Sequence, residues 1–178
     1  MLQSSLRPQD VFVLAKLVAS VAPRPTMAQL GADLSMSSSQ IHASLKRLEK
    51  SHLIAGSREG GRPLLKAVEE FLIHGVKYAF PAQRGEVTRG IPTAYAGPPL
   101  DEHIAPGADL PPVWPDPAGK VRGTSLDPLH KMVPAAIRRD PALYELLSLI
   151  DALRDGRVRE RQIAERELTS RLRKRLHG

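Results

Sequence analysis

The chain of 178 residues is long enough for one domain, or for a small domain with an extension. Its composition, 42% hydrophobic and 25% charged, is ordinary for a globular protein and excludes wholesale disorder. Without cysteine it can hold no disulfide and no thiolate metal site, and its net charge of +7 favours an anionic partner, nucleic acid before a membrane surface.

The positive charge lies toward the two ends of the chain. Residues 1–66 hold nine Lys or Arg against four Asp or Glu, residues 67–140 hold eight against nine, and residues 141–178 hold nine against six. The first residues lack the basic and apolar regions of a signal peptide, and no apolar run approaches the roughly 20 residues of a membrane-spanning helix. We therefore expect a cytoplasmic protein with no membrane partner.

The first predicted helix spans residues 7–20. Apolar residues recur there at helical spacing, beginning with Val11 and Leu14, and Pro8 suits the first turn. The sequence APRP, residues 22–25, ends the helix.

Two capped helices are predicted next. Thr26 suits the N-cap of a short helix over residues 27–34, and Ser37 suits the N-cap of a longer one over residues 38–51. The apolar positions of the longer helix are Ile41, Leu45 and Leu48.

A small hairpin or basic loop follows. Leu53 and Ile54 can form a short strand, and Gly60 and Gly61 supply the positive φ of a tight turn. Pro63 argues against a long returning strand, because proline cannot donate a hydrogen bond to its neighbour.

The middle of the chain changes from helical to proline-rich. A fourth helix is predicted over residues 64–80, and eleven of the sixteen prolines then fall within residues 81–134, which forbids long helices. Residues 113–123 favour a two-stranded ribbon that turns at residues 116–119. We expect this segment to be ordered, rich in loops and draped over the helices.

The C-terminal part is predicted to form amphipathic helices. Asp140 and Pro141 are a cap and first-turn signature, and Asp155-Gly156 interrupts the pattern before it continues to Leu176. The last segment either packs on its own domain or forms a dimer helix.

Residues 26–54 read TMAQLGADLSMSSSQIHASLKRLEKSHLI. A capped short helix, small Gly31 where two helices cross, a three-residue turn and a serine-capped helix follow one another. This order resembles the winged helix-turn-helix of bacterial transcriptional regulators, in particular the multiple-antibiotic-resistance-regulator (MarR) type, over about residues 8–66. Ser35 and His52 stand where glycine is common in that family, and residues 37–39 lack the arginine often found early in its recognition helix.

The predicted elements together give a mainly α fold. Its parts are a winged helix-turn-helix DNA-binding domain with a short wing at residues 1–66, a helix plus the proline-containing loop-rich segment at 67–140, and C-terminal helices at 141–178. The resemblance of the first part implies binding to double-stranded DNA and regulation of transcription. We expect a repressor, because repression needs only occupancy of a site, and a homodimer, because such proteins read two half-sites about 34 Å apart.

Residues 38–51 are the expected recognition helix. The major groove, about 12 Å wide, admits one α-helix whose outward side chains are short or basic. Gln40 can bond adenine in a bidentate way, while Lys46 and Arg47 suit phosphate or guanine. The residues predicted to bind DNA, from this helix and the wing, are Ser37, Ser38, Ser39, Gln40, His42, Ala43, Lys46, Arg47, Arg58 and Arg62.

Other functions stay open from the sequence. A helix-turn-helix scaffold can serve as an antitoxin or adaptor that binds another protein. Residues 81–134 can hold a small-molecule effector or a protein partner around Tyr95, Trp114 and residues 83–93. Alternatively, they have only a structural role and cover the fourth helix. A hydrolase built on residues 101–103 is the weakest hypothesis, because the six histidines are dispersed and no nucleophile or phosphate-loop motif occurs. We therefore expect no catalytic residues, no metal and no cofactor.

Overall fold

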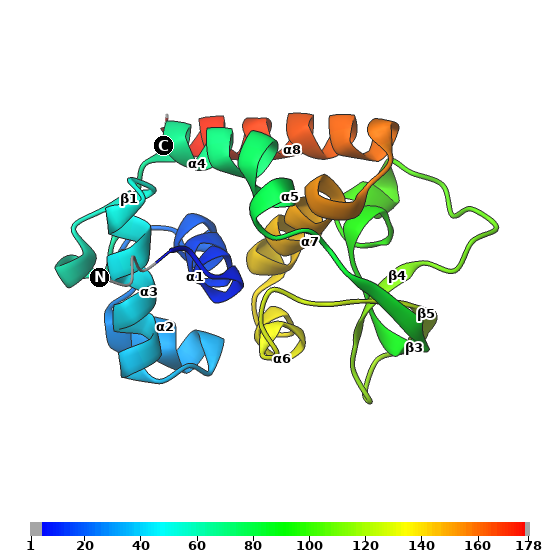
Figure 1. Cartoon of the computed structure of the whole chain (residues 1–178), viewed down its shortest axis with the longest axis horizontal. Helices are drawn as coiled ribbons and strands as arrows, with labels where there is room; N and C mark the ends of the chain where they lie inside the picture. Colours follow the sequence, from blue (N-terminus) through cyan, green and yellow to red (C-terminus); the bar gives the residue numbers. More distant parts are fainter. Residues whose placement is uncertain (1–4, 177–178) are drawn as a thin grey trace.

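Two groups of elements lie at opposite ends of the long axis of the molecule, and long helices connect them (Figure 1). The computed structural model describes residues 5–176, except for the side chains of Glu59 and Leu176. One end is formed by helices α1 (Pro8–Ala19), α2 (Met27–Leu34) and α3 (Ser38–Lys50). The other end is formed by strands β3 (Arg84–Pro92), β4 (Pro112–Pro115) and β5 (Val121–Leu126). Helices predominate, as predicted, but the fold is mixed α/β, because the proline-rich middle contains a sheet that the predicted mainly α fold lacks.

The predicted caps set the ends of α2 and α3. Thr26 Oγ1 accepts a hydrogen bond from Gln29 N at 3.2 Å, and Gln29 Oε1 accepts one from Thr26 N at 2.8 Å. Ser35, which follows α2, and His52, which lies just beyond α3, have φ of 53° and 56°. Both positions need the left-handed conformation, which is why glycine is the common residue at such helix ends.

A two-stranded antiparallel sheet follows α3. It consists of β1 (Ile54–Ala55) and β2 (Arg62–Pro63), joined through a 3₁₀ turn at Ser57–Glu59. Gly60 and Gly61 have φ of 86° and 80°, as the predicted turn requires. A Cβ atom on Gly61 would lie 2.8 Å from Ile54 Cδ1, so the turn also needs glycine for space.

The predicted fourth helix is present with an irregular centre. It comprises α4 (Leu65–Glu70), a π-helical turn (Phe71–Gly75) and α5 (Val76–Ala79). Val68, Leu72 and Val76 are buried along its length.

The proline-rich middle folds into a closed three-stranded sheet. Strand β3 pairs antiparallel with β4 and with β5, while β4 and β5 lie parallel to each other. Residues 83–93, predicted as a loop, are therefore mostly strand. The turn at residues 116–119 exists, but the ribbon predicted around it is wrong as a hairpin, because β4 and β5 each pair antiparallel with β3 and pair with each other in parallel.

Glycines allow these strands to cross closely. A Cβ atom on Gly90 would lie 2.1 Å from the carbonyl oxygen of Trp114, and one on Gly123 would lie 2.2 Å from the carbonyl oxygen of Pro111. Any side chain at either position would push the backbones apart. This contact depends on residues far apart in sequence, which local patterns do not reveal.

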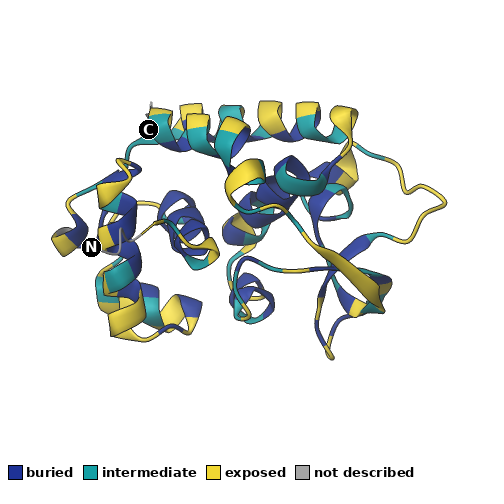
Figure 2. Cartoon of the chain, in the orientation of Figure 1, coloured by how far each residue is buried: buried dark blue, intermediate teal, exposed yellow. Residues whose placement is uncertain are grey.

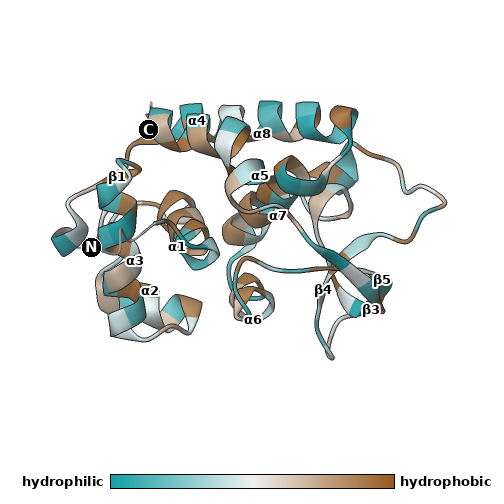
Figure 3. Ribbon diagram, in the orientation of Figure 1, coloured by the Kyte–Doolittle hydropathy of each residue, from teal (hydrophilic) through white to brown (hydrophobic). Residues whose placement is uncertain are grey.

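The C-terminal helices connect the two ends. They are the short α6 (Val133–Ile137), α7 (Pro141–Asp155) and α8 (Val158–Leu176), with Asp140 capping α7 through Leu143 N at 3.0 Å. Helix α7 contacts α1, α8 and the 3₁₀ turn after β3, at Ala94–Ala96. Buried residues concentrate where these elements meet (Figure 2), and the same surfaces are hydrophobic (Figure 3). Among residues 5–176, no helix has the length and apolarity to cross a membrane.

A buried polar cluster attaches the sheet to α7. Asp151, 1% exposed, accepts hydrogen bonds from Thr93 Oγ1 and Trp114 Nε1, each at 2.8 Å, and pairs with Arg154 at 2.7 Å. Arg154 in turn donates to the carbonyl oxygen of Phe80 at 2.7 Å. The cluster satisfies a carboxylate that would otherwise be costly to bury.

Candidate nucleic-acid interface

The outward face of α3 carries most of the side chains predicted to contact DNA. Ser37, Ser38, Ser39, Gln40, His42 and Lys46 are exposed, and Ala43 is half-buried. The opposite face anchors the helix: Ile41, Leu45 and Leu48 are each fully buried. The exposed face therefore presents short side chains at its start and a lysine further along.

Arg47 does not belong to this face. Its Nε and Nη2 atoms donate to the Asp10 carboxylate at 2.8 and 2.7 Å, and Nη2 also donates to Ser44 Oγ at 3.2 Å. Arg47 is 7% exposed and Asp10 is fully buried. These hydrogen bonds raise the pKa of Arg47 above its usual value, although burial opposes the shift. The prediction that Arg47 faces DNA is wrong, because the guanidinium pairs α3 with α1, where Asp10 lies in the first turn directly before the apolar run.

The first turn of α3 is held by a reciprocal cap. Ser37 Oγ accepts a hydrogen bond from Gln40 N at 3.2 Å, and Gln40 Oε1 accepts one from Ser37 N at 2.9 Å. The predicted bidentate contact of Gln40 with adenine needs that oxygen, so it would require the cap to open. In this conformation, the amide nitrogen of Gln40 is the part of its side chain available to a ligand.

The hairpin β1–β2 places two arginines beside α3. Arg58 and Arg62 are both exposed, as predicted. The segment that carries Arg58 is attached to α3, because Glu49 accepts hydrogen bonds from the backbone nitrogen of Ser57 at 3.0 Å and from its hydroxyl group. These bonds lower the pKa of Glu49, which favours the carboxylate form that accepts them. The arginines therefore extend a basic surface from α3 along the hairpin.

A basic hollow continues this surface. A cavity of about 680 Å³ lies between the end of α1, β2, the start of α4 and the end of α8, and the cationic residues that line it are Arg24, Arg62, Lys66 and Arg175. Its lining contains no carboxylate. Arg175 is fixed there by donating to the carbonyl oxygens of Ala19 and Ser20, at 2.7 and 2.5 Å.

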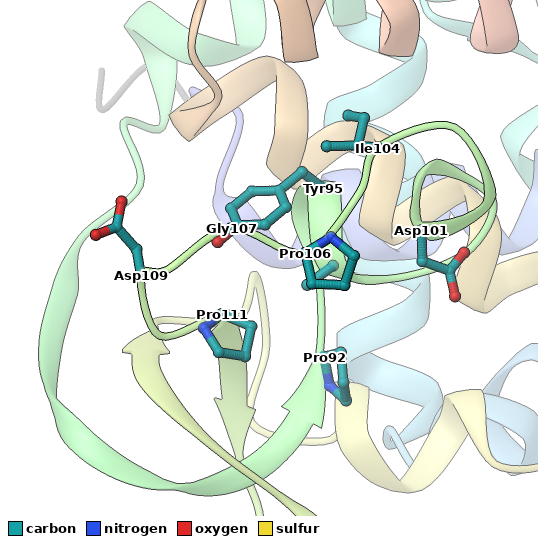
Figure 4. Close-up of a pocket in the computed structure, with 9 residues that line it drawn as sticks. Pro92, Tyr95, Asp101, Ile104, Pro106, Gly107, Asp109 and Pro111 are labelled. Carbon is teal, nitrogen blue, oxygen red and sulfur yellow. The ribbon is translucent and has the colours of Figure 1, made fainter.

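The middle segment holds a smaller hollow away from α3 (Figure 4). Its volume is about 250 Å³, and Tyr95 lies at its centre with prolines around it and with Asp101 and Asp109 on opposite sides. Burial raises the pKa of Tyr95. Trp114, predicted to share such an effector pocket, is instead 1% exposed and bonded to Asp151, so it belongs to the core.

The side chains of residues 101–103, the candidate hydrolase cluster, do not come together at one site. His103 Nε2 lies 3.5 Å from Glu167 Oε1, whereas Asp101 lines the hollow around Tyr95. Within the part of the chain that the structure describes, no group of three or more His, Asp or Glu side chains is placed to hold a metal ion.

The apolar face of α8 is covered within the chain. Ile163, Ala164, Leu168 and Leu172 are buried, and α8 packs on α7 and α4. Packing on its own domain was one of the two roles predicted for this segment. The homodimer stays a prediction, and it would have to use another surface.

A scan against protein-family models, a search of curated proteins and a search of solved structures gave no match to this chain.

Proposed function

We propose that the protein binds double-stranded DNA and regulates transcription, as a repressor, with residues 8–66 acting as a winged helix-turn-helix and α3 as the recognition helix. The observation that carries the proposal is the division of α3 into a fully buried apolar face and an exposed face of serines, His42 and Lys46. A helix that enters the major groove, which is about 12 Å wide, needs such an exposed face of short and basic side chains.

The geometry supports a revised set of contacts. Ser38, Ser39 and His42 face the base edges, while Lys46, Arg58 and Arg62 contact phosphates on either side. Ser37 and Gln40 act mainly by holding the first turn, whose free backbone N–H groups attract a phosphate. Arg47 is removed from the set.

The contact set implies modest direct readout. Serine hydroxyls donate or accept with any base, so much of the selectivity would come from the shape of the DNA, which sets where the wing arginines meet the phosphates. Selected sites should therefore share a preference for groove width as well as a short sequence.

The test is selection of duplexes from a random library by the full chain, followed by footprinting of the enriched sequence. We expect one protected site per bound α3, and two sites about one helical turn apart if the protein is a homodimer. A chain that enriches no duplex, and instead co-purifies with one stoichiometric protein, would contradict the proposal and favour an adaptor. Repression is tested by placing the enriched site over a promoter, where expression of the protein should lower reporter output.

A further inference from the structure

The outer face of the β3–β5 pair carries two arginines directly opposite each other. Arg89 on β3 is the register partner of Arg122 on β5, and both are exposed. Lys120, one residue before β5, is exposed too. Like charges directly across an antiparallel pair destabilise it, since their Cβ atoms are only about 5 Å apart.

Both arginines point away from the protein. On the adjacent positions, Gly90 and Gly123 leave no space for a Cβ atom against the backbones of Trp114 and Pro111, so that face of the strands is packed inward. Arg89 and Arg122 alternate with these glycines and therefore face outward. The pair of strands β3 and β5, called the ribbon from here on, is exposed (Figure 2) and hydrophilic (Figure 3) on that side.

No carboxylate neutralises the pair within the described residues. The ion pairs of this region join Arg84 to Asp155 at 2.6 Å and Arg138 to Asp116 at 2.5 Å, and none involves Arg89, Lys120 or Arg122. Glu86 lies at the irregular part of β3, between the paired positions Arg84 and Val87, and forms no ion pair.

The two guanidinium groups are carried on a fixed support. Tyr144 on α7 donates to the carbonyl oxygen of Pro92 at 2.6 Å at one end of β3, and Arg84 pairs with Asp155 at the other. An anion that bound between the arginines would thus meet two strands already paired in register, and it would relieve the repulsion between the two charges.

We propose that Arg89, Arg122 and Lys120 form a second nucleic-acid contact, which binds the phosphate backbone of duplex DNA without reading its sequence. Paired guanidinium groups match the geometry of phosphate oxygens, and exposed Val87 on the same face adds an apolar contact for the sugar. The ribbon lies at the other end of the long axis from α3 (Figure 1), so it contacts phosphates that α3 does not reach. The choice of DNA as the anion rests on the proposed function; the anionic site itself does not.

The test measures binding of the full chain to a fluorescent duplex of arbitrary sequence between about 50 and 200 mM salt. The variant Arg89→Gln/Arg122→Gln should bind about tenfold more weakly, and its plot of log affinity against log salt should be shallower by nearly 2, about 0.9 for each lost phosphate contact. Arg166→Gln/Arg173→Gln, with two exposed arginines removed from α8, is the matched control and should behave like the parent.

Three further arms make the outcomes distinct: the variant Arg122→Glu, the variant Lys46→Ala, and binding of the ribbon variants to phosphatidylserine vesicles. Arg122→Glu should raise the midpoint of thermal unfolding by about 2 °C, because an opposite-charge pair replaces a like-charge pair, and it should lose duplex affinity. If Lys46→Ala weakens binding but the ribbon variants do not, the ribbon proposal is wrong and the function stands. If the ribbon variants weaken binding but Lys46→Ala does not, the ribbon site stands and the proposed function of α3 is contradicted. A parent chain that binds no duplex, or ribbon variants that lose only binding to phosphatidylserine vesicles, would overturn the nucleic-acid contact.

Discussion

Ser35 and His52 show, at the scale of one residue, a local conformational cost at the ends of α2 and α3. Each holds φ near +55° at a helix end, a conformation that glycine adopts readily and other residues adopt at a cost of about 1 kcal/mol. Neither side chain is buried. Packing of these side chains therefore does not offset the conformational cost.

Ser35→Gly should raise the free energy of unfolding by about 0.5–1 kcal/mol, because relief of the strained φ exceeds the added entropy of the unfolded chain. Urea unfolding measures it. Ser51→Gly is the control, since Ser51 has φ of −87° and gains no such relief. Equal effects of the two changes would contradict this account of the turn.

The Arg47–Asp10 pair is a second feature at this scale. Arg47→Met should lower the free energy of unfolding by about 3–5 kcal/mol, because it leaves the fully buried Asp10 carboxylate without its main partner. Lys46→Met, one position earlier on the exposed face, should change it by less than about 0.5 kcal/mol. If Arg47→Met were as stable as Lys46→Met, Arg47 would not be the link between α1 and α3.

At the scale of an element, a substitution in the first turn of α3 should change DNA affinity without lowering the free energy of unfolding. Gln40→Glu keeps the reciprocal cap with Ser37 and places a negative charge at a helix N-terminus, so the free energy of unfolding should stay within about 0.5 kcal/mol of the parent or rise. The same charge faces the DNA backbone and should lower affinity for a selected duplex. A variant that loses stability, or one that keeps full affinity, would show that this turn does not lie where we place it.

The elements differ in how far the sequence predicts them. Thr26 and Ser37 mark the starts of α2 and α3 because capping is local, and the apolar spacing of Ile41, Leu45 and Leu48 correctly assigns the buried side of α3. Local patterns do not predict strand β3, because its pairing depends on partners about 30 residues away and on glycines at the crossings.

The candidate site was predictable to a similar degree. Exposure of Lys46, Arg58 and Arg62 follows from residue type and helical spacing. The inward turn of Arg47 does not, because its partner Asp10 lies 37 residues earlier in the chain. The cross-strand pair Arg89–Arg122 was likewise invisible before the register of β3 and β5 was known.

At the scale of the whole molecule, α7 joins the two ends. Tyr144 packs against Trp114 and donates to the carbonyl oxygen of Pro92, while Asp151 holds Thr93 and Trp114. The sheet therefore cannot move away from the helices without breaking buried hydrogen bonds.

This junction predicts a dependence on alkaline pH. Burial, and secondarily the charge of Asp101, raises the pKa of Tyr144 to about 12, above its value of about 10 in an unfolded chain. The stability contributed by the neutral phenol is fully present below pH 10 and is lost as the pH rises toward 12. Tyr144→Phe should be less stable than the parent at pH 8, and the difference should shrink above pH 10. Other groups titrate in both proteins alike, so a difference that stayed constant up to pH 11 would contradict the prediction.

We propose above that α3 and the β1–β2 hairpin bind duplex DNA. The most direct test compares the affinity of a selected duplex for the parent, for Lys46→Ala/Arg58→Ala/Arg62→Ala, and for the control Arg159→Ala/Arg166→Ala/Arg173→Ala, which removes the same charge from the exposed side of α8. We predict that the first variant loses at least about 30-fold in affinity and that its salt dependence becomes shallower by about 2.7, while the control stays close to the parent. Equal losses in the two variants, or none in either, would contradict binding of duplex DNA by α3 and the hairpin.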